Sequence, residues 1–377
     1  MGKKKVVVVT GITGQDGSFM VEYLLKNTEH DIYGTVRRLS VKNHKNLEHI
    51  KDPRFKLIDL DLNDSQSITA AIVKLKPDYF INFAAQSFVS ASWSMPKQTF
   101  ETNATAVLDI LEAVRQFAPN CRFYNAGTSE EFGDVLYSPQ DEKHPLRPRS
   151  PYGASKAAAR HLVKVYRESY NLYAVQGWLF NHEGVRRGEE FVTRKITKGV
   201  AKIFTAMMDN KPFEPLELGN MSSKRDWSDA EDFIEGVWMM LNQEQYNPEL
   251  KKEFEALPFP ARTEQFLSKK VNDYVLASGE THLIAEFVEK AFEAANIDAE
   301  LRWDGDWATA KFVVRGTDIV LVKTNSKFFR PAEVDLLLGS PERVKAELGW
   351  KPNITFPQLV TKMVENDIKL HKYEARS

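Results

Sequence analysis

The feature that most constrains the fold of this chain is a glycine-rich turn directly behind its first apolar run. Val6-Val7-Val8-Val9 is β-branched and predicts a buried strand, and the segment 11–17 (Gly-Ile-Thr-Gly-Gln-Asp-Gly) follows it. Glycines spaced G-x-x-G-x-x-G permit a tight turn and let backbone N–H groups approach a pyrophosphate at the start of a helix. Three glycines also fit an ordinary turn, but their place behind the first strand favours a dinucleotide site.

Short β-branched or aromatic runs alternate with helical stretches through the first half of the chain. The expected strands are Val6–Thr10, Ile32–Val36, Lys56–Leu60, Tyr79–Asn82, Arg122–Ala126 and Tyr173–Leu179. The helical stretches between them include Ser18–Lys26, Ser65–Leu75 and Ala104–Phe117. This alternation predicts an α/β fold, a Rossmann-like doubly wound parallel sheet. Because ligands of such sheets bind at the carboxyl ends of the strands, the chemistry is expected there.

The pattern becomes irregular beyond residue 182. Residues 243–271 are charged, contain Pro258 and Pro260 among their prolines and lack a clear period, so we predict an exposed insertion. An amphipathic helix is expected over residues 356–371. We therefore expect residues 1–181 to form the dinucleotide-binding Rossmann domain, and residues 182–377 to form mainly a smaller substrate-binding cap, with some segments returning to the first domain.

Charge and cysteine content exclude several classes of function. The chain has 51 basic and 52 acidic residues, a balance that argues against nucleic acid or an anionic membrane as the main partner. With Cys121 as its single cysteine, it forms no intrachain disulfide and is not expected to bind a metal. No apolar run approaches the roughly 20 residues of a membrane span. The basic start is followed by an apolar run that stops at Thr10, which favours a strand over a signal peptide and predicts a cytoplasmic protein.

Arg37 and Arg38 follow the second expected strand. A NAD enzyme usually carries an acidic residue there for the ribose 2′-hydroxyl. Guanidinium groups instead suit a 2′-phosphate through charge-assisted bidentate bonds, so the pair favours NADP. Two solvated surface arginines remain the alternative.

Ser150-Pro151-Tyr152-Gly153-Ala154-Ser155-Lys156 predicts the start of a helix, with Ser150 as N-cap and Pro151 in the first turn. Tyr152 and Lys156 are four residues apart and share one helix face. A nearby ammonium favours the phenolate, so Tyr152 can accept a proton near neutral pH. Lys156 can also hold the nicotinamide ribose. A tyrosine and a lysine at this spacing are common on helices. Together with the glycine turn upstream, however, the pair strongly indicates a dinucleotide-dependent enzyme.

The fifth expected strand ends in Gly127-Thr128-Ser129-Glu130. A simple tyrosine-dependent dehydrogenase needs only a hydroxyl at this point. An enzyme that eliminates water beside a transient ketone must also remove an acidic C–H proton and protonate the leaving hydroxyl, and Glu130 can do both in turn. The alternative is a strand-end turn in which Thr128 caps a helix.

With these motifs on one chain, the sequence resembles the extended short-chain dehydrogenase/reductase family and, within it, the GDP-mannose 4,6-dehydratases. The resemblance covers most of the chain apart from the insertion and residues 300–325. Its further motifs are Asp61-Leu62, Ala85-Gln86-Ser87, Leu179-Phe180-Asn181-His182-Glu183, Arg186-Arg187-Gly188, Phe191-Val192-Thr193-Arg194-Lys195, Lys224-Arg225-Asp226-Trp227 and Arg330-Pro331-Ala332-Glu333-Val334.

The resemblance implies a role for each matching position. The cofactor-binding residues it implies are Gly11, Ile12, Thr13, Gly14, Gln15, Asp16, Arg37, Arg38, Ser40, Asp61, Leu62, Phe83, Ala84, Ala85, Gln86, Ser87, Tyr152, Lys156, His182 and Arg187. The substrate-binding residues it implies are Ser87, Asn181, Lys195, Arg225, Arg330 and Glu333, and the catalytic ones are Thr128, Glu130, Tyr152 and Lys156. Cationic side chains suit the diphosphate of a GDP-sugar, although surface charge would also explain each of them. The family also implies a homotetramer, with a dimer as the alternative.

The implied reaction is a hydro-lyase reaction with no net redox change. Tyr152 takes the C4 hydroxyl proton while hydride passes from C4 to NADP and later returns to C6. Glu130 removes the C5 proton and, with Thr128 polarising the leaving group, water departs from C6. When the hydride returns to C6, a proton goes to C5.

Departures from the family leave alternatives open. Gly127 stands where Ser is usual, and Glu131-Phe132 where Leu-Tyr is usual; Phe83 and Gln98 also differ. Because Gly127 and Glu131 flank Glu130, they are expected to reshape the sugar pocket, and a smaller residue 127 would admit GDP-manno-heptose. An epimerase or reductase on this fold, a side activity that reduces the keto product, and a non-enzymatic NADP sensor are the remaining alternatives.

Overall fold

The computed structural model describes residues 4–38, 44–243, 271–328 and 337–374, and these form two compact units. The first unit comprises Met1–Leu179, Phe233–Leu276 and Ser340–Lys351; the second comprises Phe180–Asp232, Ala277–Gly339 and Pro352–Ser377. Apart from its first and last residues, the predicted insertion 243–271 lies outside the described residues. No helix within the described ranges is long and apolar enough to cross a bilayer.

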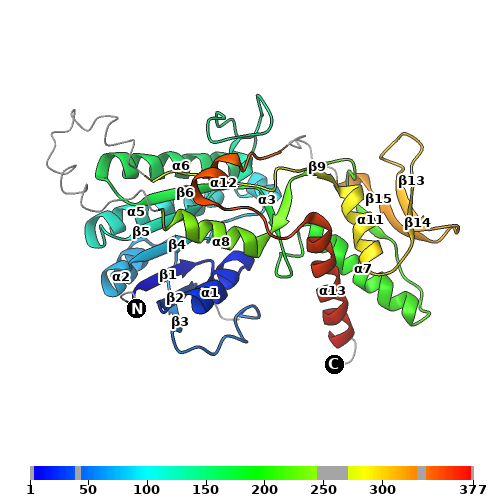
Figure 1. The fold of residues 1–377 in the computed structure, drawn as a ribbon, viewed down its shortest axis with the longest axis horizontal. Coiled ribbons are helices and arrows are strands. Elements are labelled where there is room, and N and C mark those ends of the chain that lie inside the picture. The colour runs from blue at the N-terminus through cyan, green and yellow to red at the C-terminus, as the bar shows by residue number, and fades with distance from the viewer. Residues whose placement is uncertain (1–3, 39–43, 244–270, 329–336, 375–377) are drawn as a thin grey trace. The chain divides into compact units, whose positions relative to one another are not determined.

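Seven strands in the described part of the first unit form one sheet, in the order β11-β6-β5-β4-β1-β2-β3 (Figure 1). They are β1 Val6–Thr10, β2 Asp31–Val36, β3 Phe55–Asp59, β4 Tyr79–Asn82, β5 Arg122–Ala126, β6 Ala174–Leu179 and β11 Val275–Leu276. Every neighbouring pair is parallel, which confirms the predicted doubly wound α/β fold. Each strand expected from the sequence begins and ends within one residue of an observed one.

Helices cover both faces of this sheet (Figure 1). The helical elements of this unit are α1 Gln15–Asn27, α2 Ser65–Leu75, α3 Val89–Ser94, α4 Pro96–Phe100, the π-helix η1 Glu101–Thr105, α5 Ala106–Phe117, the 3-10 helix η2 Ser129–Glu131, α6 Pro151–Tyr170, α8 Ala230–Met240 and α12 Glu342–Leu348. Apolar residues of α2, α5 and α6 pack with Phe80 and Phe123 in one core. Because successive strand residues face opposite sides, Tyr79 points the other way, and its ring centroid lies 4.8 Å from that of Trp238 on α8.

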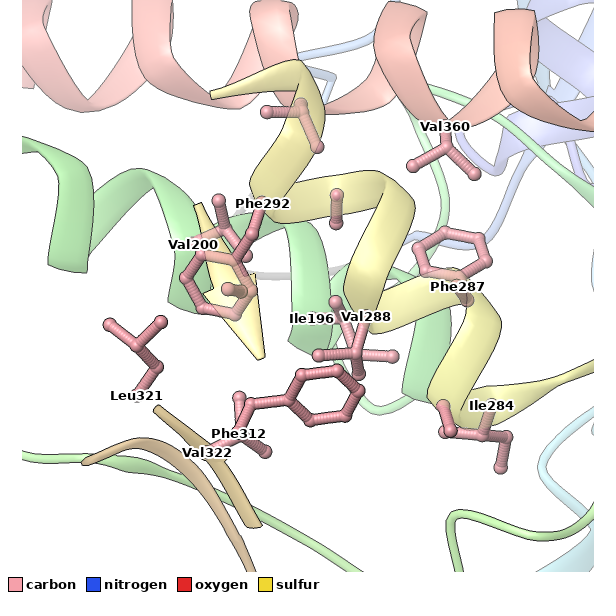
Figure 2. Packing of buried hydrophobic residues seen from close by; sticks show 14 of the residues in the cluster. Ile196, Val200, Ile284, Phe287, Val288, Phe292, Phe312, Leu321, Val322 and Val360 are labelled. Carbon is pink, nitrogen blue, oxygen red and sulfur yellow. The ribbon is translucent and has the colours of Figure 1, made fainter. Parts of the chain in front are cut away.

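The second unit has its own core. Its elements are β7 Asn181–Glu183, α7 Val192–Met208, β8 Leu216–Leu218, β9 Lys224–Arg225, β10 Trp227–Asp229, β12 His282–Leu283, α11 Ile284–Ala294, β13 Ala299–Arg302, β14 Lys311–Val314, β15 Val320–Thr324, η4 Ser326–Phe328 and α13 Phe356–Glu374. Strands β13, β14, β15 and β8 form a four-stranded sheet in that order. Figure 2 shows Phe287 and Phe292 of α11 among apolar side chains of α7, α13 and this sheet. The predicted helix 356–371 is confirmed and ends three residues later.

Candidate active site

The turn that follows β1 has no room for a side chain at two of its glycines, Gly11 and Gly17. Gly11 has φ +64°, and a Cβ built on it would lie 2.8 Å from the backbone nitrogen of Ala84. A Cβ on Gly17 would lie 2.4 Å from the carbonyl oxygen of Gly11. Gly14 is the N-cap of α1 and, as a glycine, makes no side-chain cap bond of its own. The backbone therefore comes close enough to cradle a pyrophosphate against the positive end of the helix, which fits the expected dinucleotide.

The other expected cofactor residues of this unit lie at the carboxyl ends of neighbouring parallel strands. Arg37 and Arg38 are exposed after β2. Asp61 follows β3 and accepts a hydrogen bond from the backbone N–H of Asn63 at 3.0 Å, and the adjacent Leu62 is buried. Ser40 lies outside the described residues.

The segment Phe83–Ser87 after β4 is held by Asn103, which the sequence analysis missed. Its Oδ1 accepts from the Gln86 backbone N–H at 2.8 Å, and its Nδ2 donates to the Gln86 carbonyl at 3.0 Å and to the Ser155 hydroxyl at 3.1 Å. Asn103 is buried in the π-helix η1, a deviation that often marks functional sites. The local sequence gives no clear signal for it, because the segment Glu101–Thr105 around it is mostly polar. The contacts tie the expected cofactor loop to α6.

Helix α6 presents the predicted tyrosine and lysine on one buried face. The Ser150 hydroxyl accepts from the Gly153 N–H at 3.0 Å, so the predicted N-cap is confirmed. The Lys156 Nζ donates to the Ala126 carbonyl at 2.7 Å, at the end of β5. Burial lowers the pKa of Lys156 to about 8, although two nearby carboxylates, Glu131 and Asp16, oppose this shift.

The turn after β5 is a capped 3-10 helix that lies against α6. The Thr128 hydroxyl accepts from the Glu130 N–H at 3.3 Å, and Glu131 Oε1 accepts from the Thr128 N–H at 2.9 Å, which forms a capping box. A Cβ on Gly153 would lie only 2.6 Å from the Glu130 carbonyl oxygen, so the turn packs on the first turn of α6, beside Tyr152. The capping interpretation is therefore correct, and the same turn brings Thr128 and Glu130 to the helix that carries Tyr152 and Lys156.

The expected effect of Gly127 and Glu131 on a sugar pocket is wrong. Glu131 is fully buried, with its carboxylate ion-paired to Arg160 of α6. A Cβ on Gly127 would lie 2.2 Å from the Gly177 carbonyl oxygen and 2.6 Å from Glu131 Oε1. Residue 127 therefore faces the protein interior, and a smaller side chain there opens no space for a longer sugar.

The remaining expected residues belong to the second unit. His182 Nδ1 lies 2.9 Å from the Phe180 carbonyl oxygen, and Arg187 forms an ion pair with Glu183 at 3.0 Å. The Lys195 Nζ lies 3.6 Å from the ring centroid of Phe328, and burial lowers its pKa. The other residues expected in this group are Asn181 on β7, Arg225 on β9, and Arg330 and Glu333, which lie outside the described residues. Within the described ranges, no group of three His, Cys, Asp or Glu side chains is placed to hold a metal ion.

Solved structures with similar folds come from several sugar-nucleotide enzymes. UDP-glucose 4-epimerase of Thermotoga maritima, solved with UDP-glucose, matches with a TM-score of 0.74 at 18% identity, covering 97% of this chain and 99% of that one. A dTDP-glucose 4,6-dehydratase of Streptomyces venezuelae with NAD bound also has a TM-score of 0.74, at 19% identity and 98% coverage of both chains. At these identities the likeness establishes the fold alone.

Sequence relatives are considerably more similar. The GDP-mannose 4,6 dehydratase of Drosophila melanogaster is 44% identical, covering 98% of this chain and 87% of the relative, and the human one is 39% identical, covering 98% and 93%. The family model described as GDP-mannose 4,6 dehydratase matches residues 8–255 and 262–363. The expected resemblance is confirmed: this chain belongs to the GDP-mannose 4,6-dehydratase family.

Proposed function

We propose that this protein is a hydro-lyase that converts GDP-mannose to GDP-4-keto-6-deoxy-mannose with bound NADP. The observation that carries the proposal is the packing of the Glu130 turn against the first turn of α6. It brings Glu130, whose carboxylate an epimerase or a simple dehydrogenase does not need, to the helix of the Tyr152 and Lys156 pair. The curated names of the sequence relatives supply the substrate.

Four side chains perform the proton transfers in this proposal. Tyr152 takes the proton of the C4 hydroxyl, and the ammonium of Lys156, held on the Ala126 carbonyl, stabilises the phenolate. Glu130 then removes the C5 proton, which the new C4 ketone has made acidic, and passes a proton to the C6 hydroxyl as it leaves. Thr128 polarises that leaving group. Bound NADP would supply the acceptor and donor for the hydride that moves from C4 to C6. As the hydride reaches C6, C5 regains a proton, which Tyr152 can return from the C4 hydroxyl.

The preference for NADP rests on Arg37 and Arg38. Their exposed guanidinium groups follow β2, where the ribose of a dinucleotide bound at the glycine turn is expected. No acidic residue replaces them at this strand end. The charge-assisted bonds they offer suit a 2′-phosphate rather than a hydroxyl.

The Arg37→Ser/Arg38→Ser variant is expected to bind NADP more weakly by roughly 10²-fold or more, because each charge-assisted bond contributes about 1.5–3 kcal/mol. Binding of NAD should change little. Calorimetric titration of nucleotide-free protein with both cofactors measures the difference. Lys51→Ser, which removes an exposed cation outside this strand end, is the matched control. Equal weakening of NAD and NADP binding would contradict the assignment.

The proposed function is tested by incubating purified protein with GDP-mannose, without added reductant, and following the nucleotide sugar by mass spectrometry. Loss of the mass of one water is expected, with the cofactor unchanged at the end. Unchanged mass would refute the hexose as substrate. GDP-manno-heptose is then the next compound to test, and a product of unchanged mass but altered C4 configuration would identify an epimerase. Consumption of added NADPH would reveal the side reduction of the keto product.

The assembly and location belong to the same proposal. The family resemblance supports a homotetramer, and light scattering after size-exclusion chromatography distinguishes it from a dimer. The likeness to relatives named for a reaction of a nucleotide sugar supports a cytoplasmic location.

A further inference from the structure

A row of buried polar side chains crosses four neighbouring strands of the first unit's sheet. The Thr10 hydroxyl donates to Asn82 Oδ1 at 2.5 Å, Asn82 Nδ2 donates to Asn125 Oδ1 at 2.8 Å, and Asn125 Nδ2 donates to Gln176 Oε1 at 2.7 Å. The four residues pair across β1, β4, β5 and β6, and each is at most 2% exposed. We call this row the amide ladder. It links the strand that leads into the glycine turn to the strand beside the catalytic turn.

All the side-chain hydrogen bonds of the amide ladder run in one direction, and they end on a carboxylate. Gln176 Nε2 donates to Glu131 Oε1 at 3.1 Å. Since a carboxylate only accepts, it fixes which end of the Gln176 amide faces it, and this choice passes along the ladder from amide to amide. At the far end, the Thr10 oxygen accepts from the Ala84 N–H at 3.1 Å, in the expected cofactor loop.

Glu131 is held by a buried cation. Arg160 Nε donates to Glu131 Oε2, and its other nitrogens donate to the Gln176 carbonyl at 2.7 Å and the Gly177 carbonyl at 3.0 Å. Both side chains are at most 5% exposed. The Glu131 carboxylate is therefore held in one position by Arg160, whose nitrogens also bond two backbone carbonyls.

The same carboxylate contacts the catalytic turn and lies near the lysine. Glu131 Oε1 accepts the Thr128 N–H at 2.9 Å, and Gln176 Nε2 also donates to the Lys156 carbonyl at 3.1 Å. The negative charge of Glu131 raises the pKa of Lys156 and so opposes the effect of burial. Glu131 thus supports the turn that carries Thr128 and Glu130 directly and acts on Lys156 through its charge, while Gln176, which Glu131 orients, holds the Lys156 carbonyl.

We infer that Glu131 is a positioning residue whose buried carboxylate orients the amide ladder and couples the order of the catalytic turn to that of the cofactor loop. It touches neither substrate nor cofactor in this role. The inference rests on the proposed function only where kcat on GDP-mannose is measured. The hydrogen–deuterium exchange measurement does not depend on it.

The Glu131→Gln variant tests this with little change in volume. Its amide NH₂ must face one of the donors that now meet a carboxylate, and Arg160 loses its closest counter-charge. We expect kcat on GDP-mannose to fall on the order of 10²-fold from misplacement of the reacting groups, with KM within about twofold. Hydrogen–deuterium exchange should rise in residues 126–132 and also in residues 83–88, at the other end of the ladder. Glu112→Gln, which removes another carboxylate paired with an arginine (Arg115, 2.8 Å), is the matched control and should change neither segment.

A second variant separates positioning from stability. Replacing both partners, as Glu131→Leu/Arg160→Met, removes this buried pair together, a change that is often neutral or stabilising. Asp273, which also lies 3.5 Å from Arg160, keeps its closer pair with Arg167 at 2.8 Å. We expect its melting temperature to be near that of the wild type while kcat stays low. Recovery of kcat along with stability would overturn the inference, as would faster exchange confined to residues 126–132 in Glu131→Gln. If the wild type does not dehydrate GDP-mannose, the proposed function fails, but the exchange at both segments still decides the positioning role.

Discussion

Replacing Glu130 by Gln is expected to abolish the loss of water from GDP-mannose while leaving oxidation at C4 in place. Glutamine keeps the size of the side chain and the capped turn, because the Thr128 hydroxyl bonds the backbone N–H of residue 130 rather than its side chain. It cannot accept the C5 proton or protonate the leaving hydroxyl. General acid–base catalysis contributes about 10²–10⁴-fold per group, and since Glu130 serves both steps we expect the upper end of that range.

Two measurements on this variant distinguish the steps. Mass spectrometry should detect no dehydrated product, whereas the near-ultraviolet absorbance of reduced nicotinamide should rise after GDP-mannose is added to the cofactor-loaded protein. Asp134→Asn removes a carboxylate that pairs with Arg147 shortly after the same turn, and should retain full activity. Dehydration by Glu130→Gln at more than about a tenth of the wild-type rate would rule out Glu130 as the acid and base.

The fold of the sheet unit was largely predictable because its strands are short apolar runs bounded by turns. The errors lie where a distant contact determines the local structure. Helix α1 begins at Gln15, three residues before the expected Ser18. Gly17 is a poor helix former, so the sequence suggested that the helix starts after it. The fold requires glycine there because a Cβ would meet the Gly11 carbonyl. Helix α5 begins at Ala106, two residues later than expected. The residues before it form a π-helix in which Asn103 bonds Gln86, and no local pattern predicts that partner.

The candidate site was predictable only where a short motif carries it. Tyr152 and Lys156 are one helical turn apart, and Thr128 and Glu130 belong to one strand-end turn, so their spacing alone brings each pair together. The buried residues that hold these side chains in place depend on strand register, so the sequence alone did not predict their contacts. Gln176 meets Asn125, and Glu131 meets Arg160, only once β5 and β6 are paired. Polar residues within the otherwise apolar strands were the available signal. Glu131 was assigned to a sugar pocket because a charged residue beside a catalytic one is normally expected at the surface.

Replacing Lys156 by Met is expected to have opposite effects on activity and on stability. Without the ammonium, Tyr152 loses the charge that stabilises its phenolate, so kcat should fall on the order of 10²–10⁴-fold. The folded state, however, disfavours the charged lysine, because burial lowers its pKa to about 8. The fall of this pKa from 10.5 to about 8 corresponds to about 3 kcal/mol of unfolding free energy, part of which the lost hydrogen bond to the Ala126 carbonyl offsets.

The pH dependence gives this prediction its sign. Between about pH 8 and pH 10 the unfolded chain keeps the Lys156 proton and the folded one loses it, so the stability of the wild type rises with pH through this window. Lys156→Met lacks this proton, so its advantage over the wild type should be greatest below about pH 8 and shrink above it. Urea unfolding of nucleotide-free proteins across this range measures the difference. Wild-type activity should fall over the same pH window, because Lys156 then loses the positive charge that stabilises the phenolate of Tyr152. A stability difference independent of pH would mean that Lys156 is not titrating there.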